Sequence, residues 1–333
     1  MIVVRTPFRI SFVGGGTDLP YHYLQHGGCV LSMAIRKYSY LSMHRGFHDT
    51  GYLIKYSRTE SPERVSDIEH PIIRTVFQMY GIDGVDFASA ADIPAGTGLA
   101  SSSAFTCGLL RLCDAYTGKT RSHLDIADAA CDVEINRLGE PIGKQDQYGC
   151  ALPGLKKIEF NTDGSVLASP VLLNDTARQR LEDSLMLVYC GGNRSASKQL
   201  QAQKKNIADS AQLVANLNEM AQQAHRLSTD LLRDPGCLGD YLHDGWERKK
   251  RLSDGISTPE IDALYHTARG AGARGGKLLG AGGAGFMLLH VPDCYDDVAK
   301  ALGGQKIDRV HMDETGTTVV HNDQTEAWVT PTP

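Results

Sequence analysis

The sequence predicts an α+β protein of two domains, for three reasons. A chain of 333 residues is too long for one ordinary hydrophobic core. Apolar runs separated by turn residues crowd the N-terminal part and are typical of one sheet, whereas 196–232 carries apolar residues at broadly helical spacing. A hairpin-like segment at 156–169 then precedes a polar stretch, so we expect an N-terminal domain over 1–175 and a C-terminal domain over 176–325.

The composition is that of a globular protein of the cytoplasm. Hydrophobic residues make up 41% of the chain, charged residues 22%, and the formal net charge is -5. Because basic residues are not in excess, we expect neither nucleic acid nor a membrane as a partner. The N-terminus lacks the apolar core of a signal peptide, and no run reaches the roughly 20 apolar residues of a membrane span. The eight cysteines show no paired CxxC spacing, so we expect neither disulfides nor zinc.

The N-terminal part is expected to form one sheet and a helix. Residues 8–12 alternate apolar and polar side chains and end in the glycines 14–16, which predicts a half-buried strand. Arg9 and Asp18, at either end of this stretch, are either structural, a solvated arginine and a turn-closing aspartate, or functional. Further strands are expected at 29–35, 38–43, 52–56 and 85–89, with a helix at 71–80.

The C-terminal part mixes long helices with fewer strands. A strand at 184–189 ends in a Gly-Gly turn where Arg194 and Lys198 could bind phosphate. Asp293 is expected to cap a final helix that runs to Leu302. The other expected elements are helices at 196–232, 241–252 and 257–268, a strand at 286–291, and a terminal hairpin of 309–312 with 317–321.

A glycine loop at 94–104, PAGTGLASSSA, precedes a helix whose apolar residues face one side. Free backbone N–H groups and the helix dipole at such a terminus bind anions, including nucleotide phosphates. A serine hydroxyl there could ligate a phosphate-bound Mg²⁺. The alternative is that Ser101 or Ser102 is an ordinary N-cap.

Glu134 lies beside the apolar stripe of the next helix, which Ser122 is expected to cap and Gly139 to end. A carboxylate buried there needs a partner, since burying it bare costs several kcal/mol or more. Glu134 is therefore either a boundary residue that faces water or a metal ligand. Asp146 follows in the loop 139–149 and is unremarkable by itself.

Two familiar nucleotide motifs are excluded. The pair Gly143-Lys144 is followed by Gln145, so the P-loop pattern GxxxxGK[ST] is missing. Residues 280–285 match GxGxxG, yet they open a strand rather than a helix, which excludes a Rossmann dinucleotide site.

Three segments in order resemble the motifs of the GHMP small-molecule kinases: TPFRISFVGGGTD at 6–18, PAGTGLASSSA at 94–104 and KLLGAGGAGF at 277–286. The intervals from Arg9 to Asp18 and from Glu134 to Asp146 match the sugar-kinase branch of that family. Segments 5–20, 26–42 and 191–197 most resemble its D-glycero-D-manno-heptose 7-phosphate kinases. The resemblance implies an N-terminal domain like the second domain of ribosomal protein S5 and a ferredoxin-like C-terminal domain.

The resemblance also implies a role for individual residues, with ATP and Mg²⁺ as cofactors and a small sugar phosphate as substrate. Asp146 would be the general base or orienter of the sugar hydroxyl, and Arg9 would stabilise it and the migrating phosphoryl group. Ser102, with Ser101 as second choice, and Glu134 would hold Mg²⁺. ATP would bind Pro94, Gly96, Thr97, Gly98, Leu99, Ala100, Ser101, Ser102 and Ser103, and the substrate would bind Asp18, Gly15, Gly16, Thr17, Arg194, Lys198, Gly282 and Gly283, with Tyr38 and Arg36 as weaker candidates.

The alternatives to a heptose kinase are a 1-kinase of an unphosphorylated sugar, of the L-fucose or galactose type, and a non-catalytic sensor of ATP and sugar. The form GGGTDLP at 14–20 differs from that of galactokinases. The joint presence of Arg9, Ser102, Glu134 and Asp146 argues against a sensor, which has no need of the base. Either a monomer or a homodimer is compatible with the sequence. One departure from the family's common GLGSSAA is Ala100 with an additional Ser103.

Overall fold

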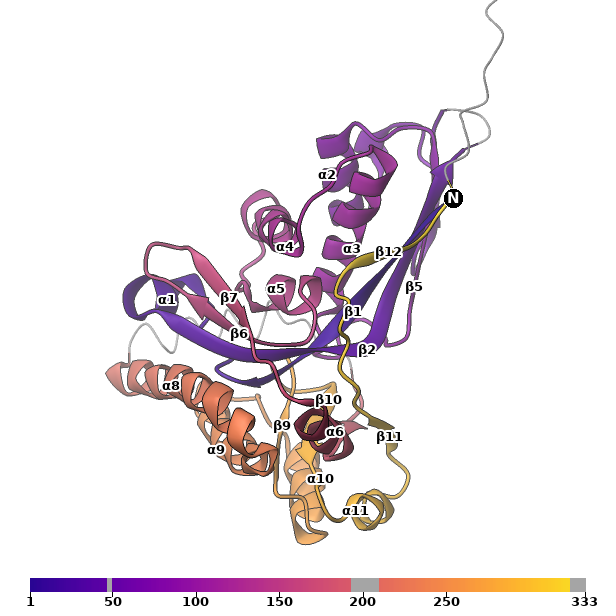
Figure 1. Ribbon diagram of the computed structural model, residues 1–333. Coiled ribbons are helices and arrows are strands. Elements are labelled where there is room, and N and C mark those ends of the chain that lie inside the picture. Colours follow the sequence, from indigo (N-terminus) through magenta and orange to yellow (C-terminus); the bar gives the residue numbers. More distant parts are fainter. Residues whose placement is uncertain (47–49, 193–209, 324–333) are drawn as a thin grey trace, which may run out of the picture.

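The computed structural model describes residues 1–46, 50–192 and 210–323, which form two β-sheets with helices packed around them (Figure 1). The larger sheet has eight strands, six of them in the order β12-β1-β2-β5-β3-β4; β6 also pairs with β2, and β7 pairs with β6. The smaller sheet has the order β11-β8-β10-β9 and is antiparallel throughout. The strands are β1 Ile2–Val13, β2 Gly28–Arg45, β3 Tyr52–Lys55, β4 Thr59–Glu60, β5 Val85–Ala91, β6 Leu155–Phe160, β7 Val166–Pro170, β8 Leu185–Tyr189, β9 Gly275–Leu278, β10 Phe286–His290, β11 Lys306–Arg309 and β12 Thr318–Asn322.

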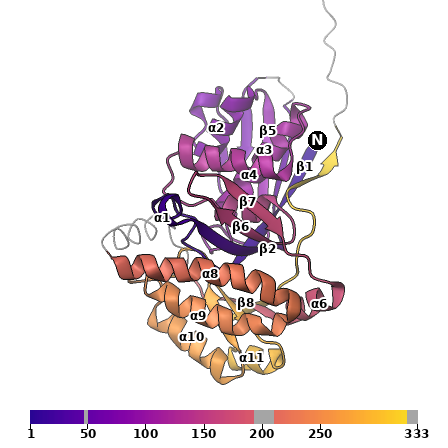
Figure 2. The ribbon, with the colours of Figure 1, turned by 60° about the vertical axis from the view of Figure 1, so that its left-hand side comes forward.

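The helices form layers on both sides of the larger sheet. Figure 1 shows α2, α3 and α4 over one face, and α8 and α9 on the other side, next to the smaller sheet; Figure 2 shows α8 crossing between the two parts. Within the described ranges, no helix is both long and apolar enough to span a membrane. The helices are α1 Pro20–His26, α2 Pro71–Tyr80, α3 Ser101–Tyr116, α4 His123–Cys131, α5 Gln145–Ala151, α6 Asp175–Asp183, α8 Ala211–Arg233, α9 Leu238–Lys250, α10 Pro259–Gly270 and α11 Tyr295–Ala301, with short turns at Val65–Asp67 and Pro235–Cys237 and a π-helix at Asp132–Arg137.

Most of the expected strands and helices are present, including the hairpin of β6 and β7, but five expectations are wrong. Residues 145–149 of the expected loop belong to α5, and residues 8–12, expected to be half-buried, are buried on both faces. The segments 29–35 and 38–43 form one strand, β2. The terminal hairpin does not exist, because β11 pairs with β8 whereas β12 pairs with β1 and so adds a strand to the larger sheet. Asp293 does not cap α11, because the N-cap of this helix is Cys294. The carboxylate of Asp293 instead accepts a hydrogen bond from Arg274.

A register shift in β1 decides which side chains face the helices. Ile2 and Val4 belong to the core beneath α2, α3 and α4, whereas Phe8 belongs to the core between the two sheets, although all three have even numbers. The pairing of β1 with β2 is shifted between Pro7 and Phe8, and such a bulge exchanges the two faces of a strand. Arg9 therefore points toward α3 and α5 rather than into the core between the sheets.

Two glycine turns interlock where the sheets meet. The amide of Phe286 donates a hydrogen bond to the carbonyl of Thr97 at 3.2 Å, which joins β10 to the glycine loop. Gly98 has φ +87°, and a Cβ there would lie 2.6 Å from the carbonyl oxygen of Leu279. Only glycine combines this backbone conformation with this approach. The contact fixes the glycine loop against the turn between β9 and β10.

The close approach at Gly98 predicts that Gly98→Ala destabilises the protein by about 3 kcal/mol or more, as measured by urea unfolding, because strain adds to a backbone clash. Gly164→Ala is the matched control, since Gly164 has φ +86° with open space around its Cβ position. We expect the control to cost only about 1 kcal/mol, the price of the left-handed conformation. Equal losses in the two variants would contradict the interlocking of the turns.

Candidate active site

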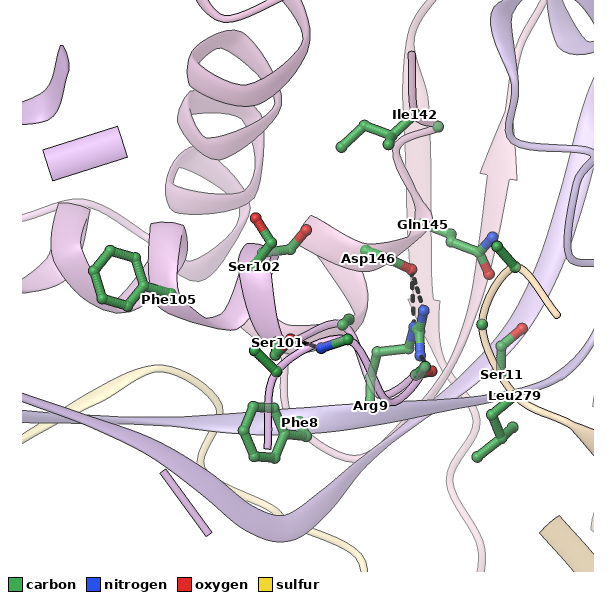
Figure 3. A pocket seen from close by; sticks show the side chains of 18 of the residues that line it. Phe8, Arg9, Ser11, Ser101, Ser102, Phe105, Ile142, Gln145, Asp146 and Leu279 are labelled. Carbon is green, nitrogen blue, oxygen red and sulfur yellow. Dashed lines mark hydrogen bonds and ion pairs between the residues drawn. The ribbon is translucent and has the colours of Figure 1, made fainter. Parts of the chain in front are cut away.

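A cavity of about 700 Å³ lies where the two sheets meet (Figure 3). Its wall comes from β1, the glycine loop, the start of α3, and the segments before α5 and after β9. The predicted residues that line it are Arg9, Gly15, Gly16, Asp18, Gly96, Gly98, Ala100, Ser101, Ser102, Ser103, Glu134, Asp146 and Gly282. Segments separated by more than 100 residues thus meet around one space.

The glycine loop presents the N-terminus of α3 to this cavity. Ala100 has φ 64° and is the only described non-glycine residue with positive φ. As the N-cap of α3 it makes no side-chain hydrogen bond, so the interpretation of Ser101 or Ser102 as an ordinary N-cap is wrong. Backbone N–H groups of the first helical turn are thus left without a side-chain cap, as in anion sites at helix termini.

Three predicted loop residues do not line the cavity. The hydroxyl of Thr97 donates a hydrogen bond to the carbonyl of Pro94 at 2.8 Å, which closes the turn from inside. The side chain of Leu99 is buried in the core between the sheets. Pro94, Thr97 and Leu99 therefore shape the loop, while its glycines and serines form the surface.

Arg9 joins β1 to the helix that carries Asp146. Its Nε donates to Asp146 Oδ1 at 2.9 Å, its Nη2 donates to the same oxygen at 2.5 Å, and its Nη1 donates to the carbonyl of Gly98 at 2.8 Å (Figure 3). Arg9 is 3% exposed and Asp146 31%. Among the described residues, Asp146 Oδ2 has no partner, so it is available to a ligand in the cavity.

Glu134 faces the serines at the start of α3. It lies on the π-helix that continues α4, a distortion that often marks functional sites. Its Oε1 accepts a hydrogen bond from Ser102 at 2.7 Å, and its Oε2 accepts bonds from Ser103 at 2.8 Å and Gln147 at 2.6 Å. Burial raises the pKa of Glu134, and these three donors oppose the shift. The boundary interpretation of Glu134 is therefore wrong, since the side chain is buried.

Asp18 is held by backbone and side-chain donors from two segments. Its Oδ1 accepts from the amides of Gly16 at 3.1 Å and of the Gln145 side chain at 2.9 Å, and its Oδ2 accepts from the Gln145 backbone at 3.2 Å. Burial, with the charge of Asp146, raises the pKa of Asp18 to about 6. Thr17 is buried instead in hydrogen bonds with Gly14 and Cys29, so it does not line the cavity.

The remaining predicted substrate residues have mixed positions. Gly282 lines the cavity, whereas the amide of Gly283 donates to the carbonyl of Ile256 at 2.9 Å and lies behind the wall. Arg36 and Tyr38 bond to Met312 and Asp313, away from the cavity. Arg194 and Lys198 lie outside the described residues.

Several residues of the wall escape prediction from the sequence. Lys249, Lys277, Ser11 and Gln145 also line the cavity, where Gln145 bonds Asp18 and Lys277 bonds the carbonyl of Ser11. Tyr56, His70 and Phe105 form an aromatic cluster on the wall. Lys249 lies in a basic run that closes α9, which is an ordinary helix C-terminus. Lys277 lies three residues before Gly280 and opens the segment KLLGAGGAGF, which is the signal in the sequence that points to it.

The raised pKa of Asp18 predicts a pH-dependent stability. The Asp18 carboxyl keeps its proton up to about pH 6 in the folded protein, but only up to pH 3.8 in the unfolded chain. The free energy of unfolding therefore falls as the pH rises from 3.8 to about 6. In urea unfolding, we expect the free energy of unfolding of Asp18→Asn, relative to that of wild type, to rise by about 2 kcal/mol between pH 4.5 and pH 7.5. A change in stability that the amide causes equally at both pH values cancels in this comparison. A difference that does not change with pH would contradict the shift.

Comparison with known proteins agrees with this geometry. The family model for the GHMP kinases N terminal domain matches residues 68–154, and that for GHMP kinases C terminal matches residues 217–303. The D-glycero-alpha-D-manno-heptose 7-phosphate kinase of Campylobacter jejuni is 28% identical, with 90% of this chain and 93% of that protein covered. The L-fucokinase/L-fucose-1-P guanylyltransferase of Bacteroides fragilis is 26% identical, with 87% of this chain and 34% of that protein covered.

Solved structures show the same fold. The crystal structure of a D-glycero-D-manno-heptose 1-phosphate kinase from Bacteroides thetaiotaomicron has a TM-score of 0.78 at 22% identity and covers 97% of this chain and 100% of that one. The predicted fold class, with a GHMP kinase N-terminal and C-terminal domain, is confirmed. Both halves of the chain carry the family's domains, and the chain therefore belongs to the GHMP kinases and is a phosphotransferase.

Proposed function

We propose that this chain is an ATP-dependent sugar kinase that phosphorylates the anomeric 1-hydroxyl of D-glycero-D-manno-heptose 7-phosphate and yields the 1,7-bisphosphate, for nucleotide-activated heptose and surface polysaccharide. The observation that carries the proposal is the meeting of Arg9, Asp146 and the carbonyl of Gly98 at one cavity. This arrangement brings the carboxylate of Asp146, which can act as an acid or a base, close to the glycine loop that would bind the phosphates of ATP. Phosphoryl transfer needs little beyond such positioning and charge stabilisation.

In the proposed reaction, the sugar hydroxyl attacks the γ-phosphorus of ATP, the bond to the ADP oxygen breaks, and the hydroxyl proton passes to Asp146. Arg9 holds Oδ1 of that carboxylate, which leaves Oδ2 to receive the proton or orient the hydroxyl. The Arg9 guanidinium also offsets the charge of the migrating phosphoryl group. Asp18 accepts hydrogen bonds from other sugar hydroxyls, and the N-terminus of α3 binds the triphosphate.

Ser102 and Glu134 fit the Mg²⁺ that GHMP kinases generally use. Protein-bound Mg²⁺ takes one or two carboxylates plus phosphate oxygens and water, and Ser102 Oγ lies 2.7 Å from Glu134 Oε1. Ser101 is the weaker candidate, since its hydroxyl accepts from the amide of Gly96 rather than facing Glu134. When bound, the ion would supply positive charge against the β- and γ-phosphates. The additional Ser103 bonds the same carboxylate and holds it in place.

The choice of a heptose phosphate rests on the relative from Campylobacter jejuni, which aligns over nearly the whole of both chains. A 1-kinase of an unphosphorylated sugar is the alternative, because the fucokinase relatives are almost as similar. A catalytically silent sensor is disfavoured, since the cavity keeps both the Arg9–Asp146 pair and Glu134.

The proposal predicts that ADP forms from ATP and Mg²⁺ when D-glycero-D-manno-heptose 7-phosphate is offered. A panel of D-glycero-D-manno-heptose, L-fucose, D-galactose and mevalonate, with several sugar phosphates, would be compared by kcat/KM in a coupled ADP assay. We expect the heptose phosphate to be preferred by about a hundredfold or more, the size of one well-used charged contact. A preference for free L-fucose or D-galactose would overturn the substrate but keep the kinase. Failure of every acceptor would favour the sensor.

A further inference from the structure

Three cationic side chains from three elements line the cavity close enough to interact electrostatically. They are Arg9 of β1, Lys249 of α9 and Lys277 of β9, and all three are nearly buried. Buried cations are normally paired with carboxylates. Within the described ranges only Arg9 has such a partner, because Lys249 donates to the carbonyls of Leu278 and Gly280 at 2.8 and 2.6 Å, and Lys277 donates to the carbonyl of Ser11 at 2.8 Å.

These cations repel one another in the absence of a ligand. Burial, and then the charge of Arg9, lowers the pKa of Lys249 to about 7. Burial lowers the pKa of Lys277 well below its ordinary value, with contributions from Lys249 and Arg9. Each ammonium has three donors, and the carbonyls leave one donor of Lys249 and two of Lys277. An anion in the cavity would satisfy these donors and relieve the repulsion.

A free hydroxyl lies at the same place. Ser11 lines the cavity, its hydroxyl is buried, and no residue that the structure describes forms a hydrogen bond with it. A Cβ on Gly15 would lie 3.8 Å from Ser11 Oγ and 3.9 Å from the side-chain amide of Gln145, which itself binds Asp18. Ser11 therefore faces the acceptor side of the cavity, and Figure 3 shows it beyond Arg9 from the serines of α3.

We propose that Lys249, Lys277 and Ser11 form a second oxyanion subsite, separate from the ATP loop, which binds the phosphate monoester of the acceptor sugar. This inference rests on the proposed function, because it names the residues that would separate a sugar phosphate from a free sugar. The triphosphate has its own donors at the N-terminus of α3, on the other side of the Arg9–Asp146 pair. The cationic and hydroxyl groups of the wall are thereby divided between two phosphate-bearing ligands.

The test compares Lys249→Met, Lys277→Met and Ser11→Ala with wild type on a sugar phosphate and on the same sugar without its phosphate. For the sugar phosphate, we expect kcat/KM to fall about 30-fold for each lysine variant and about fivefold for Ser11→Ala. The values for the free sugar and the KM for ATP should stay near wild type. Lys250→Met is the matched control, since Lys250 is the neighbour of Lys249, pairs with Glu247 and does not line the cavity.

Equal losses on both sugars, or a raised KM for ATP alone, would overturn the subsite and assign the lysines to the nucleotide or the fold. Ser11→Ala keeps both charges and the backbone carbonyl, so it decides the matter if the lysine variants do not fold. Inorganic phosphate gives a readout without turnover. With the ATP loop saturated by a non-hydrolysable analogue, it should raise the unfolding temperature of wild type and Lys250→Met but not of Lys277→Met. This result would stand even if no heptose were phosphorylated, whereas equal stabilisation of all variants would overturn the subsite.

Discussion

The guanidinium of Arg9 holds together three segments that are far apart in the chain. It bonds the carboxylate of Asp146 on α5 and the carbonyl of Gly98 in the glycine loop, while its own backbone amide donates to the carbonyl of Leu99 at 3.3 Å. At 3% exposed, this charge is nearly removed from water, so loss of its partner would leave a buried cation uncompensated, at a cost of about 3–5 kcal/mol. The geometry of the cavity therefore depends on this junction.

Two backbone features bring the junction about. The register shift between Pro7 and Phe8 turns Arg9 toward α3 and α5, and the interlocked turns at Gly98 and Gly280 bring the smaller sheet against the glycine loop. A Cβ on Gly280 would lie 2.5 Å from the Cα of Gly98. The same contact sets the position of the turn after β9, and with it the two lysines that the smaller sheet and α9 contribute to the cavity.

Local patterns in the sequence suffice for most strands and helices and for the residues of the three motifs. They do not suffice for Lys249, which lies in no motif, nor for the contacts that Ser11 and Lys277 make from within theirs, because each of the three acquires its surroundings only when two sheets come together. The merging of 29–35 with 38–43 into one strand was likewise hidden, since the bulge at residues 36 and 37 looks like a turn in the sequence. The pairing of β12 with β1 joins the two ends of the chain, and no local signal predicts such a contact.

The central claim is that Asp146, held by Arg9, handles the acceptor hydroxyl while other groups bind ATP. The most direct measurement is the single-turnover rate of Asp146→Asn together with its affinity for ATP, with the exposed Asp297→Asn as control. The amide keeps an oxygen for Arg9 but is a far weaker base, so we predict a rate lower by about a hundredfold or more with ATP affinity unchanged. A rate near that of wild type would contradict the account.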